Sequence, residues 1–273
     1  MKALEVTDLS FSYLEDKPLL QNISFSLEEG EIFCLLGPNG SGKTTLMRQI
    51  LFAGNGATEH IRLYGKPLTR IPRMERSRLL GYVPQKLMPL QISVLQTVLM
   101  GRYPCSGSWL LKPDQKDLEI AMDAIDQMGL TKLADRQLGS LSGGEMQRVF
   151  IAQSLAKQAK IYFFDEPMSA LDPQYQAEFL LLMRWLTDRG AAVLFTTHNP
   201  NHLLSLADAK VGILNDRHTF RTIGRVTREN VDVIEETFHN SVKIAYSEYH
   251  GGFASVFRLQ AEKGADNEHP ADT

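Results

Sequence analysis

A nine-residue stretch, GPNGSGKTT at residues 37–45, carries the residue types that bind phosphate. It fits the pattern G-x-x-x-x-G-K-[ST] and links an apolar segment to a predicted helix. Its glycines let backbone N–H groups face an anion, its lysine reaches the β- and γ-phosphates of a nucleotide, and its first threonine offers a hydroxyl to Mg²⁺. The predicted phosphate-binding residues are Gly37, Pro38, Asn39, Gly40, Ser41, Gly42, Lys43, Thr44 and Thr45.

Two adjacent acidic residues, Asp165 and Glu166, follow the apolar segment IYFF at residues 161–164. A carboxylate at the end of a buried strand can hold the coordination shell of Mg²⁺, and a second one can orient or deprotonate an attacking water. We therefore expect Asp165 to be a metal ligand and Glu166 to be a catalytic base. The alternative, an acidic pair that only caps the next element, stays open.

The stretch LSGGEMQR at residues 141–148 combines a helix start with two glycines. Ser142 and Glu145 form an S-x-x-E capping box, which explains the helix start. The box does not explain Gly143 and Gly144, because a glycine costs roughly 1 kcal/mol within a helix. Glycines at a helix N-terminus let an anion approach the backbone N–H groups. Since residues 37–45 already bind one nucleotide, we expect this stretch to meet a nucleotide that another subunit holds.

Apolar segments that alternate with helical patterns must position these residues. Strands are expected at 3–13, 21–28, 31–36, 79–83, 159–164 and 191–197, with hairpins at 61–68 and 209–224, and helices at 114–129 and 173–189. The alternation predicts an α/β fold with a mostly parallel sheet. We expect one domain over residues 1–260, with a sheet-containing lobe at about 1–85 and 157–240, a helical lobe at about 86–156, and a disordered tail at 261–273.

The composition restricts the class of protein. Hydrophobic residues make up 43% and charged residues 22% of the 273 residues, which is typical of soluble globular proteins. A net charge of −3 gives no electrostatic case for nucleic-acid binding. The two cysteines, Cys34 and Cys105, indicate no disulfide framework and fit a reducing cytosol. No stretch approaches the ~20 apolar residues of a membrane helix, so another chain must hold the protein at any membrane where it acts.

Together, these motifs resemble those of ABC-type ATPases. The chain also carries SALD at residues 169–172, Gln85 in GYVPQ and His198 in FTTH, in the order and at intervals typical of that family. The resemblance covers about residues 3–240. It implies a P-loop NTPase (RecA-like) core with an antiparallel β subdomain and an inserted α-helical subdomain. One departure is Met168, where the family often has threonine.

The resemblance also implies roles for further residues. Two chains would hold two ATP molecules with Mg²⁺ head to tail. Ser142, Gly143 and Gly144 would contact the nucleotide on the partner's phosphate loop, and Asp172 would cross the dimer axis, although it can equally cap the helix that follows. Tyr13 matches the aromatic residue that stacks on adenine. The residues implied to act in hydrolysis are Glu166, His198 and Gln85, and those implied to hold Mg²⁺ are Thr44, Gln85 and Asp165.

In that family the ATPase homodimer works at the cytoplasmic face of the cell membrane. It binds a multi-span permease, expected to be a homodimer, and acts indirectly with a substrate-binding protein. A soluble ABC ATPase that acts on DNA or ribosomes is an alternative, but the interval between Gln85 and Leu141 is too short for a coiled coil and the chain has one phosphate loop. A regulatory ABC protein typically lacks the glutamate or the histidine found here at Glu166 and His198.

The stretch SVLQTVLMGRYP at residues 93–104 bears on the cargo. It resembles the V-x-x-G-R-x-P segment of ATPases from metal-chelate importers, which carry iron-siderophores, haem, cobalamin or molybdate. A purely structural interpretation is also open: an apolar helical stripe that ends at Gly101 and Pro104 accounts for every residue except Arg102. On this resemblance we expect import of such a cargo.

Overall fold

The computed structural model describes residues 1–14, 17–52, 57–88, 91–105, 113–206, 208–247 and 252–257. The strands are β1 (Lys2–Leu14), β2 (Lys17–Glu28), β3 (Ile32–Leu36), β4 (Ile61–Leu63), β5 (Lys66–Pro67), β6 (Leu80–Val83), β7 (Ile161–Phe164), β8 (Ala192–Thr197), β9 (Lys210–Leu214), β10 (Phe220–Gly224), β11 (Val242–Ser247) and β12 (Gly252–Phe257). The predicted disordered tail at 261–273 lies outside the described residues.

The α-helices are α1 (Lys43–Phe52), α2 (Arg73–Leu79), α3 (Val94–Leu99), α4 (Gln115–Gln127), α5 (Gly143–Ala156), α6 (Pro173–Asp188), α7 (Pro200–Leu204) and α8 (Val231–Thr237). Short 3₁₀ helices are η1 (Ala57–His60), η2 (Leu68–Arg70), η3 (Thr131–Leu133) and η4 (Leu138–Ser140). Among the described residues, no helix is both long and apolar enough to span a membrane.

The central sheet has the strand order β10-β9-β3-β8-β7-β6. All neighbours pair in parallel except β10, which is antiparallel to β9. Every residue of β3, β7 and β8 is buried, as expected of parallel strands covered on both faces. The register pairs Leu36 with Thr197 and Phe164 with Phe195, so the carboxyl ends of these strands meet at one edge. The predicted parallel sheet is confirmed.

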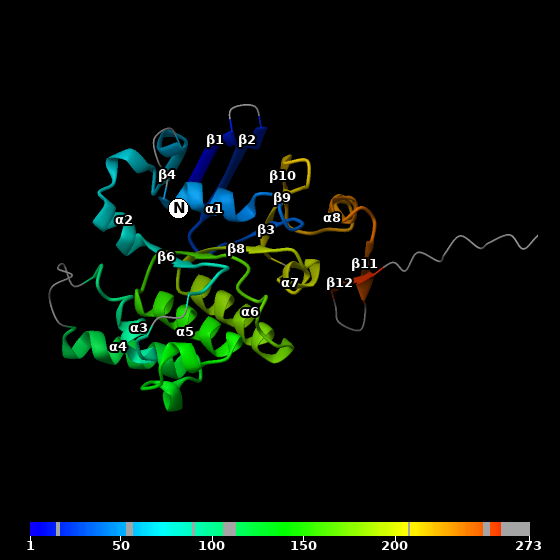
Figure 1. The fold of residues 1–273 in the computed structure, drawn as a ribbon. Helices are drawn as coiled ribbons and strands as arrows, with labels where there is room; N and C mark the ends of the chain where they lie inside the picture. The colour runs from blue at the N-terminus through cyan, green and yellow to red at the C-terminus, as the bar shows by residue number, and fades with distance from the viewer. Residues whose placement is uncertain are drawn as a thin grey trace, which may run out of the picture.

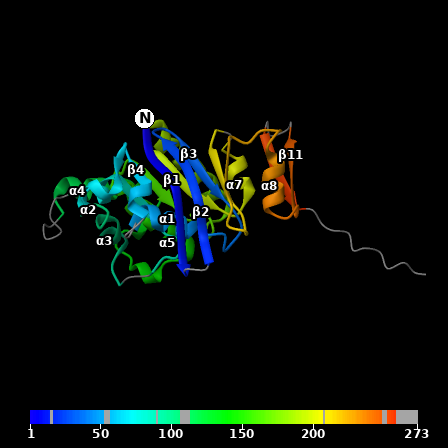
Figure 2. The same ribbon diagram turned by 90° about the horizontal axis from the view of Figure 1, so that it is seen from above.

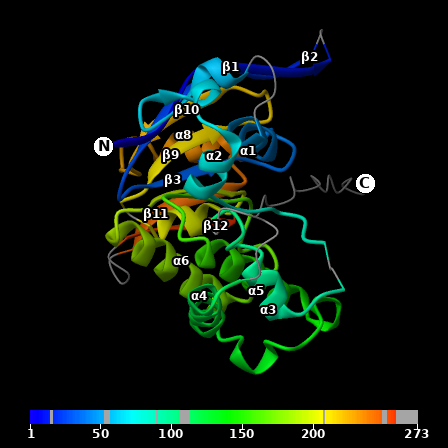
Figure 3. The same ribbon diagram turned by 90° about the vertical axis from the view of Figure 1, so that its left-hand side faces the viewer.

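Each strand of the central sheet sends alternate side chains to two separate cores. On one face, Phe33 and Leu35 join Leu46 and Met47 of α1 and the antiparallel sheet β2-β1-β4-β5. Figure 1 shows α1 and this second sheet on one side of the central strands, with α3, α4, α5 and α6 on the other. Figure 3 shows the same arrangement from the side. The α1 helix is therefore held between two sheets.

Helices α3 to α6 cover the opposite face of the central sheet. They pack against Cys34 and Leu36, and α4 buries the stripe that its sequence periodicity predicts, including Ala121, Ala124 and Ile125. Three of these helices, α3, α4 and α5, fall within the predicted helical lobe at 86–156, whose limits remain a prediction.

The C-terminal part contains elements that the sequence did not predict. The expected hairpin at 209–224 is present as β9 and β10, but α8 and the antiparallel pair β11–β12 follow it. Figure 1 places β11 and β12 beside α8 and beyond α7, at the end of the molecule away from α3 and α4, and Figure 2 shows α8 and β11 side by side at that end. Asn201 of α7 accepts a hydrogen bond from the Ser255 backbone N–H at 2.8 Å and donates to its carbonyl at 3.5 Å. These bonds tie the last strand to the helix that follows His198.

Candidate nucleotide-binding and hydrolysis site

The phosphate loop joins the end of β3 to the start of α1. A Cβ at position 37 would collide with the backbone carbonyl of Leu214 on β9, so only glycine fits there. Lys43 is 4% exposed, and its ammonium donates to the carbonyls of Gly37 at 2.8 Å and Pro38 at 3.0 Å. A cavity of about 230 Å³ lies at the loop and is lined by Leu19, Asn39, Gly40, Gly42, Lys43, Thr44, Thr45, Gln85 and Glu166.

A histidine that the sequence did not mark as functional supports this loop. His218, in the turn between β9 and β10, places Nδ1 3.1 Å from the carbonyl oxygen of Ser41. The two residues are 177 positions apart, so no local pattern could have revealed the contact. The turn holds His218 in the left-handed region at φ 58°, an uncommon conformation for a residue other than glycine. The phosphate loop is thus supported by the hairpin β9–β10, whose first strand pairs directly with β3.

The Glu166 carboxylate contacts side chains from three other parts of the fold. Its Oε1 lies 3.2 Å from Lys43 Nζ, and its Oε2 accepts a hydrogen bond from Gln85 Nε2 at 3.0 Å. His198 Nδ1 lies 3.2 Å from the same Oε2. Glu166 is 8% exposed and has φ 48°, a strained value of the kind that clusters at active sites. The three predicted hydrolysis residues and the phosphate-loop lysine therefore meet at one carboxylate.

Asp165 has the properties of a cation ligand. It is fully buried at the end of β7, and its Oδ1 accepts a hydrogen bond from the Thr196 hydroxyl at 2.8 Å. Its Oδ2 is also buried and makes no hydrogen bond within the described part of the chain. Burial raises the pKa of Asp165, and the hydroxyls of Thr196 and Thr44 partly offset that effect. A hard cation such as Mg²⁺ fits these oxygen donors, because it would satisfy the orphaned carboxylate oxygen.

Tyr13 lies beside the phosphate loop with its ring largely free. The residue is 65% exposed near the end of β1, and its hydroxyl is 3.4 Å from Thr45 Oγ1. Phe11 contacts the ring edge-on, with centroids 4.8 Å apart. An aromatic ring held at the mouth of a phosphate site can stack on a nucleotide base.

Ser142 and Gly143 at the start of α5 are exposed, and Gly144 is half-buried. Figure 1 shows α5 on the opposite side of the central sheet from α1, the helix that follows the phosphate loop. The capping box is present: Ser142 Oγ accepts from the Glu145 N–H at 3.3 Å, and Glu145 Oε2 accepts from the Ser142 N–H at 2.8 Å. The two glycines differ. A Cβ at Gly144 would meet the carbonyl of Ala170 at 3.3 Å, whereas a Cβ at Gly143 would meet nothing within 4 Å. Gly143 is thus the position that leaves the backbone open to an incoming group.

The SALD segment has a structural role that the sequence suggested. Asp172 caps α6 by accepting a hydrogen bond from the Tyr175 N–H at 3.1 Å, with Pro173 in the first turn. Asp172 is also exposed, so its role at a partner's site remains a prediction. Met168, where the family often has threonine, is 1% exposed and packs in the core between the sheet and α6.

Arg102 proves to be a structural residue. It is 8% exposed, and its Nε donates to Asp117 Oδ1 of α4 at 2.8 Å. Its Nη1 donates to the carbonyl of Ala156, the last residue of α5, at 2.8 Å. The structural interpretation of residues 93–104 therefore accounts for Arg102 as well. This stretch alone no longer argues for a particular cargo.

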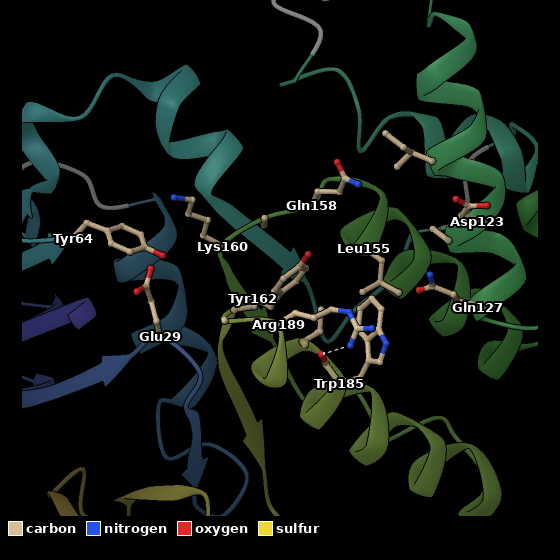
Figure 4. A pocket seen from close by; sticks show the side chains of 16 residues that line it. Glu29, Tyr64, Asp123, Gln127, Leu155, Gln158, Lys160, Tyr162, Trp185 and Arg189 are labelled. Carbon is tan, nitrogen blue, oxygen red and sulfur yellow. Dashed lines mark hydrogen bonds between the residues drawn. The ribbon is translucent and has the colours of Figure 1, made fainter. Parts of the chain in front are cut away.

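A larger cavity, of about 520 Å³, lies outside this site. Figure 4 shows its lining, which includes Tyr64, Lys160 and Tyr162 from the sheet-containing part, with Trp185 and Arg189 at the end of α6. The Arg189 guanidinium stacks 3.9 Å from the centroid of the Trp185 ring. No residue of the predicted site lines this cavity, so its greater size does not make it the reaction site.

The match to known families agrees with this geometry. Residues 20–169, more than half of the chain, match the family model described as ABC transporter. The chain belongs to this family. It is an ATPase, and members of the family use ATP with Mg²⁺.

Relatives of this ABC ATPase cover most of its length. The molybdate import ATP-binding protein MolC of Haemophilus influenzae is 35% identical over 259 residues, covering 94% of this chain and 96% of that protein. The zinc transport system ATP-binding protein TroB of Treponema pallidum is 35% identical and covers 79% of each chain. The manganese transport system protein MntB of Bacillus subtilis is 38% identical, covering 73% of this chain and 78% of that protein.

A solved structure supports the same fold. A chain from a transporter described as of the metal-chelate type, in an inward-facing conformation, superposes on this ABC ATPase with a TM-score of 0.77. The two chains are 34% identical, and the match covers 94% of this chain and 96% of the other. The expected P-loop fold is thereby confirmed.

Proposed function

We propose that this ABC ATPase is the energy-supplying subunit of an importer. It works as a head-to-tail homodimer that encloses two ATP molecules at the cytoplasmic face of a membrane. The observation that carries the hydrolytic part is the Glu166 carboxylate, which lies within hydrogen-bonding distance of Gln85 and His198 and pairs with Lys43.

ATP binding begins with the phosphate loop. The backbone N–H groups of residues 39–45 and the start of α1 attract the phosphates, and Lys43 supplies a positive charge for the β- and γ-phosphates. Tyr13 stacks on the base. Because Lys43 already pairs with Glu166 Oε1, a γ-phosphate at Lys43 replaces that contact and frees the carboxylate.

The freed Glu166 carboxylate orients the attacking water and accepts its proton. His198, on the neighbouring strand end, remains beside the carboxylate, and Gln85 bonds the same oxygen. Asp165, Thr44 and Gln85 are the residues that would hold Mg²⁺. That ion, when bound, neutralises charge on the phosphate oxygens.

The second half of each site comes from the partner subunit. Ser142 and Gly143 are exposed on the opposite side of the sheet from the phosphate loop, so they suit a nucleotide held by another copy. The N-terminus of α5 presents unpaired N–H groups to the phosphates there. Asp172, exposed at the start of α6, approaches the same site across the dimer axis.

We further propose that the cargo is a metal chelate or an oxyanion of the molybdate class. Support comes from the length of the matches: MolC and the metal-chelate transporter each cover 94% of this chain, against 79% for TroB and 73% for MntB. A match that covers 94% of the chain must include α8, β11 and β12 near its C-terminal end. These four relatives are transport proteins by name, which gives no support to a role on DNA or ribosomes.

A transport assay tests this proposal. Cells that lack the gene are compared with cells that carry the wild-type gene or the Glu166→Gln variant. Uptake of molybdate, ferric siderophore, haem, cobalamin, zinc and manganese is measured with isotopes. Uptake of molybdate or of one chelate should fall in both the deletion and the variant. Loss of zinc or manganese uptake alone would overturn the cargo class, and loss of export of a drug or lipid instead would overturn import.

A further inference from the structure

A chain of hydrogen bonds links the SALD segment to the loop that carries His198. Gln176, on the first turns of α6, donates from Nε2 to the carbonyls of Leu171 at 2.9 Å and Met168 at 3.3 Å. Its Oε1 lies 3.3 Å from His202 Nε2 on α7. His202 Nδ1 lies 2.9 Å from the hydroxyl of Thr197, the residue before His198.

The contacts favour one direction for each bond in this chain. Because the Gln176 amide nitrogen donates to two carbonyls, its oxygen faces His202, and His202 Nε2 must be the donor. His202 Nδ1 is then an acceptor for the Thr197 hydroxyl at 2.9 Å, a shorter contact than the 3.4 Å from that hydroxyl to the Asn199 carbonyl. The hydroxyl oxygen accepts from the Asn199 N–H at 3.0 Å. Asn199 Nδ2, 3.4 Å from the same Nε2, is itself a donor and so is only a neighbour.

The His202 ring is neutral in this arrangement. Burial and, to a smaller extent, the charge of His198 lower its pKa to about 4. The ring borders a cavity of about 160 Å³, which is lined by Glu166, Met168, Ser169, Gln176, Thr196, Thr197, His198, Asn199 and His202. The chain of hydrogen bonds thus runs along the wall of the cavity that Glu166 also lines. Its own members, Gln176 and His202, do not hydrogen-bond that carboxylate.

We propose that His202 and Gln176 are positioning residues that hold the SALD segment against the loop carrying His198. These hydrogen bonds hold the SALD segment, which ends at Asp172, in place relative to the loop that carries His198. A movement of the SALD segment on dimer closure is passed to His198 through this chain. The inference rests on the roles proposed above for His198 and Asp172.

The experiment removes each member without changing its bulk greatly. His202→Leu, Gln176→Leu and the double variant are compared in the full-length chain, with kcat, KM, nucleotide Kd and thermal unfolding measured. Each single variant should lose about tenfold to a hundredfold in kcat, the range that a displaced reacting group costs. Nucleotide Kd should change by less than about twofold, because the phosphate loop is untouched.

Two comparisons separate positioning from general stability. Gln174→Leu is the matched control, because Gln174 lies on the same helix but bonds Glu178 on its exposed side at 3.1 Å. It should leave kcat unchanged. The double variant should be no slower than the slower single variant, since both break one chain. His202→Gln keeps a donor and an acceptor and should restore kcat to within about threefold of wild type.

If the leucine variants fail to fold, His202→Gln and Gln176→Glu decide the matter. The carboxylate introduced by Gln176→Glu cannot donate to the carbonyls of Met168 and Leu171, so this variant should be slow while His202→Gln is fast. The proposal is overturned if the folded variants keep the wild-type kcat, if Kd rises in step with the loss of kcat, or if the single losses multiply in the double variant. A wild-type chain that does not hydrolyse ATP would instead refute the proposed function, and this inference with it.

Discussion

Lys43 Nζ and Glu166 Oε1 lie 3.2 Å apart, and both side chains are almost fully buried. Removing one charge from a buried ion pair of this kind leaves the other charge buried without a partner, which is strongly destabilising. The contact joins the residue that binds phosphate to the residue proposed to activate water. In the proposed mechanism, nucleotide binding at Lys43 therefore also releases the Glu166 carboxylate.

Glu166→Gln should lower ATP turnover by about 10² to 10⁴, because the amide cannot accept a proton. ATP should remain between two chains, so size-exclusion chromatography with ATP should show a dimer that is absent without ATP. Glu178→Gln, an exposed glutamate on α6, is the control and should hydrolyse ATP at the wild-type rate. An unchanged elution volume on adding ATP would count against the proposed sandwich.

Ser142→Arg should abolish hydrolysis while the isolated chain still binds ATP, because the added bulk enters only a partner's site. The substitution also removes the cap of α5, which costs about 1 kcal/mol. Ser142→Ala removes the same cap and hydroxyl without the bulk, so it should bind ATP as the wild type does and lose less turnover than Ser142→Arg, which separates the effect of the added bulk from that of the lost cap. Equal losses of ATP affinity and turnover in Ser142→Arg would contradict the placement across the dimer.

Tyr13→Ala should weaken ATP binding by a factor of about five to a hundred, because stacking on one base contributes about 1–3 kcal/mol. Tyr13→Phe keeps the ring and should bind ATP normally. Binding is measured by calorimetry with ATP and with tripolyphosphate, which has no base. A parallel loss of tripolyphosphate affinity would show that Tyr13 acts on the phosphate loop, where its hydroxyl approaches Thr45.

Arg102→Met should lower the free energy of unfolding by about 3–5 kcal/mol, because it leaves the Asp117 carboxylate buried without a cation. Arg102→Met combined with Asp117→Leu should recover much of that loss. The exposed pair of Arg184 and Asp208, with N and O 3.9 Å apart, is the comparison, and Arg184→Ala should cost less than about 1 kcal/mol. Urea denaturation measures all three, and equal effects at the two pairs would contradict the assignment.

His202 should make the stability of the chain depend on pH. Its pKa is about 4 in the folded protein against 6.5 for the free side chain, so the unfolded chain binds the extra proton between these values. The wild-type free energy of unfolding should therefore fall relative to His202→Gln as the pH drops from 7 to 4, by on the order of 2 kcal/mol for a partly exposed ring. Denaturation at several pH values tests this, and parallel curves for the two proteins would contradict it.

Three parts of the site could be predicted from the sequence because each follows a short, largely apolar and buried strand. Asp165 follows β7, His198 follows β8 and the phosphate loop follows β3, and parallel pairing brings those strand ends together. The apolar runs predict buried strands, and the polar residues that follow them are predicted to lie at the carboxyl-terminal edge of the sheet. Local sequence is enough for this inference.

Other parts of the site depend on contacts between distant segments. The bond from His218 to Ser41 spans 177 positions, and that from Asn201 to Ser255 spans 54. Neither leaves a periodic signal in the chain. Helix α8 has seven residues and β11 and β12 have six each, and such short elements are formed mainly by what they pack against. The sequence therefore predicted the residues of the candidate site better than the distant segments that hold them in place.

The order of the strands has a consequence for hydrogen exchange. Strand β8 lies between β3 and β7, so opening it breaks two ladders at once, and its amides should exchange only through global unfolding. Among the described strands, β6 pairs with β7 alone, so it can fray from its unpaired edge. Gln85 follows β6, whereas His198 follows β8. One cluster of side chains thus joins the end of an interior strand, whose amides should exchange slowly, to the end of an edge strand, whose amides should exchange faster, and α3 is the next helix along the chain after that edge strand.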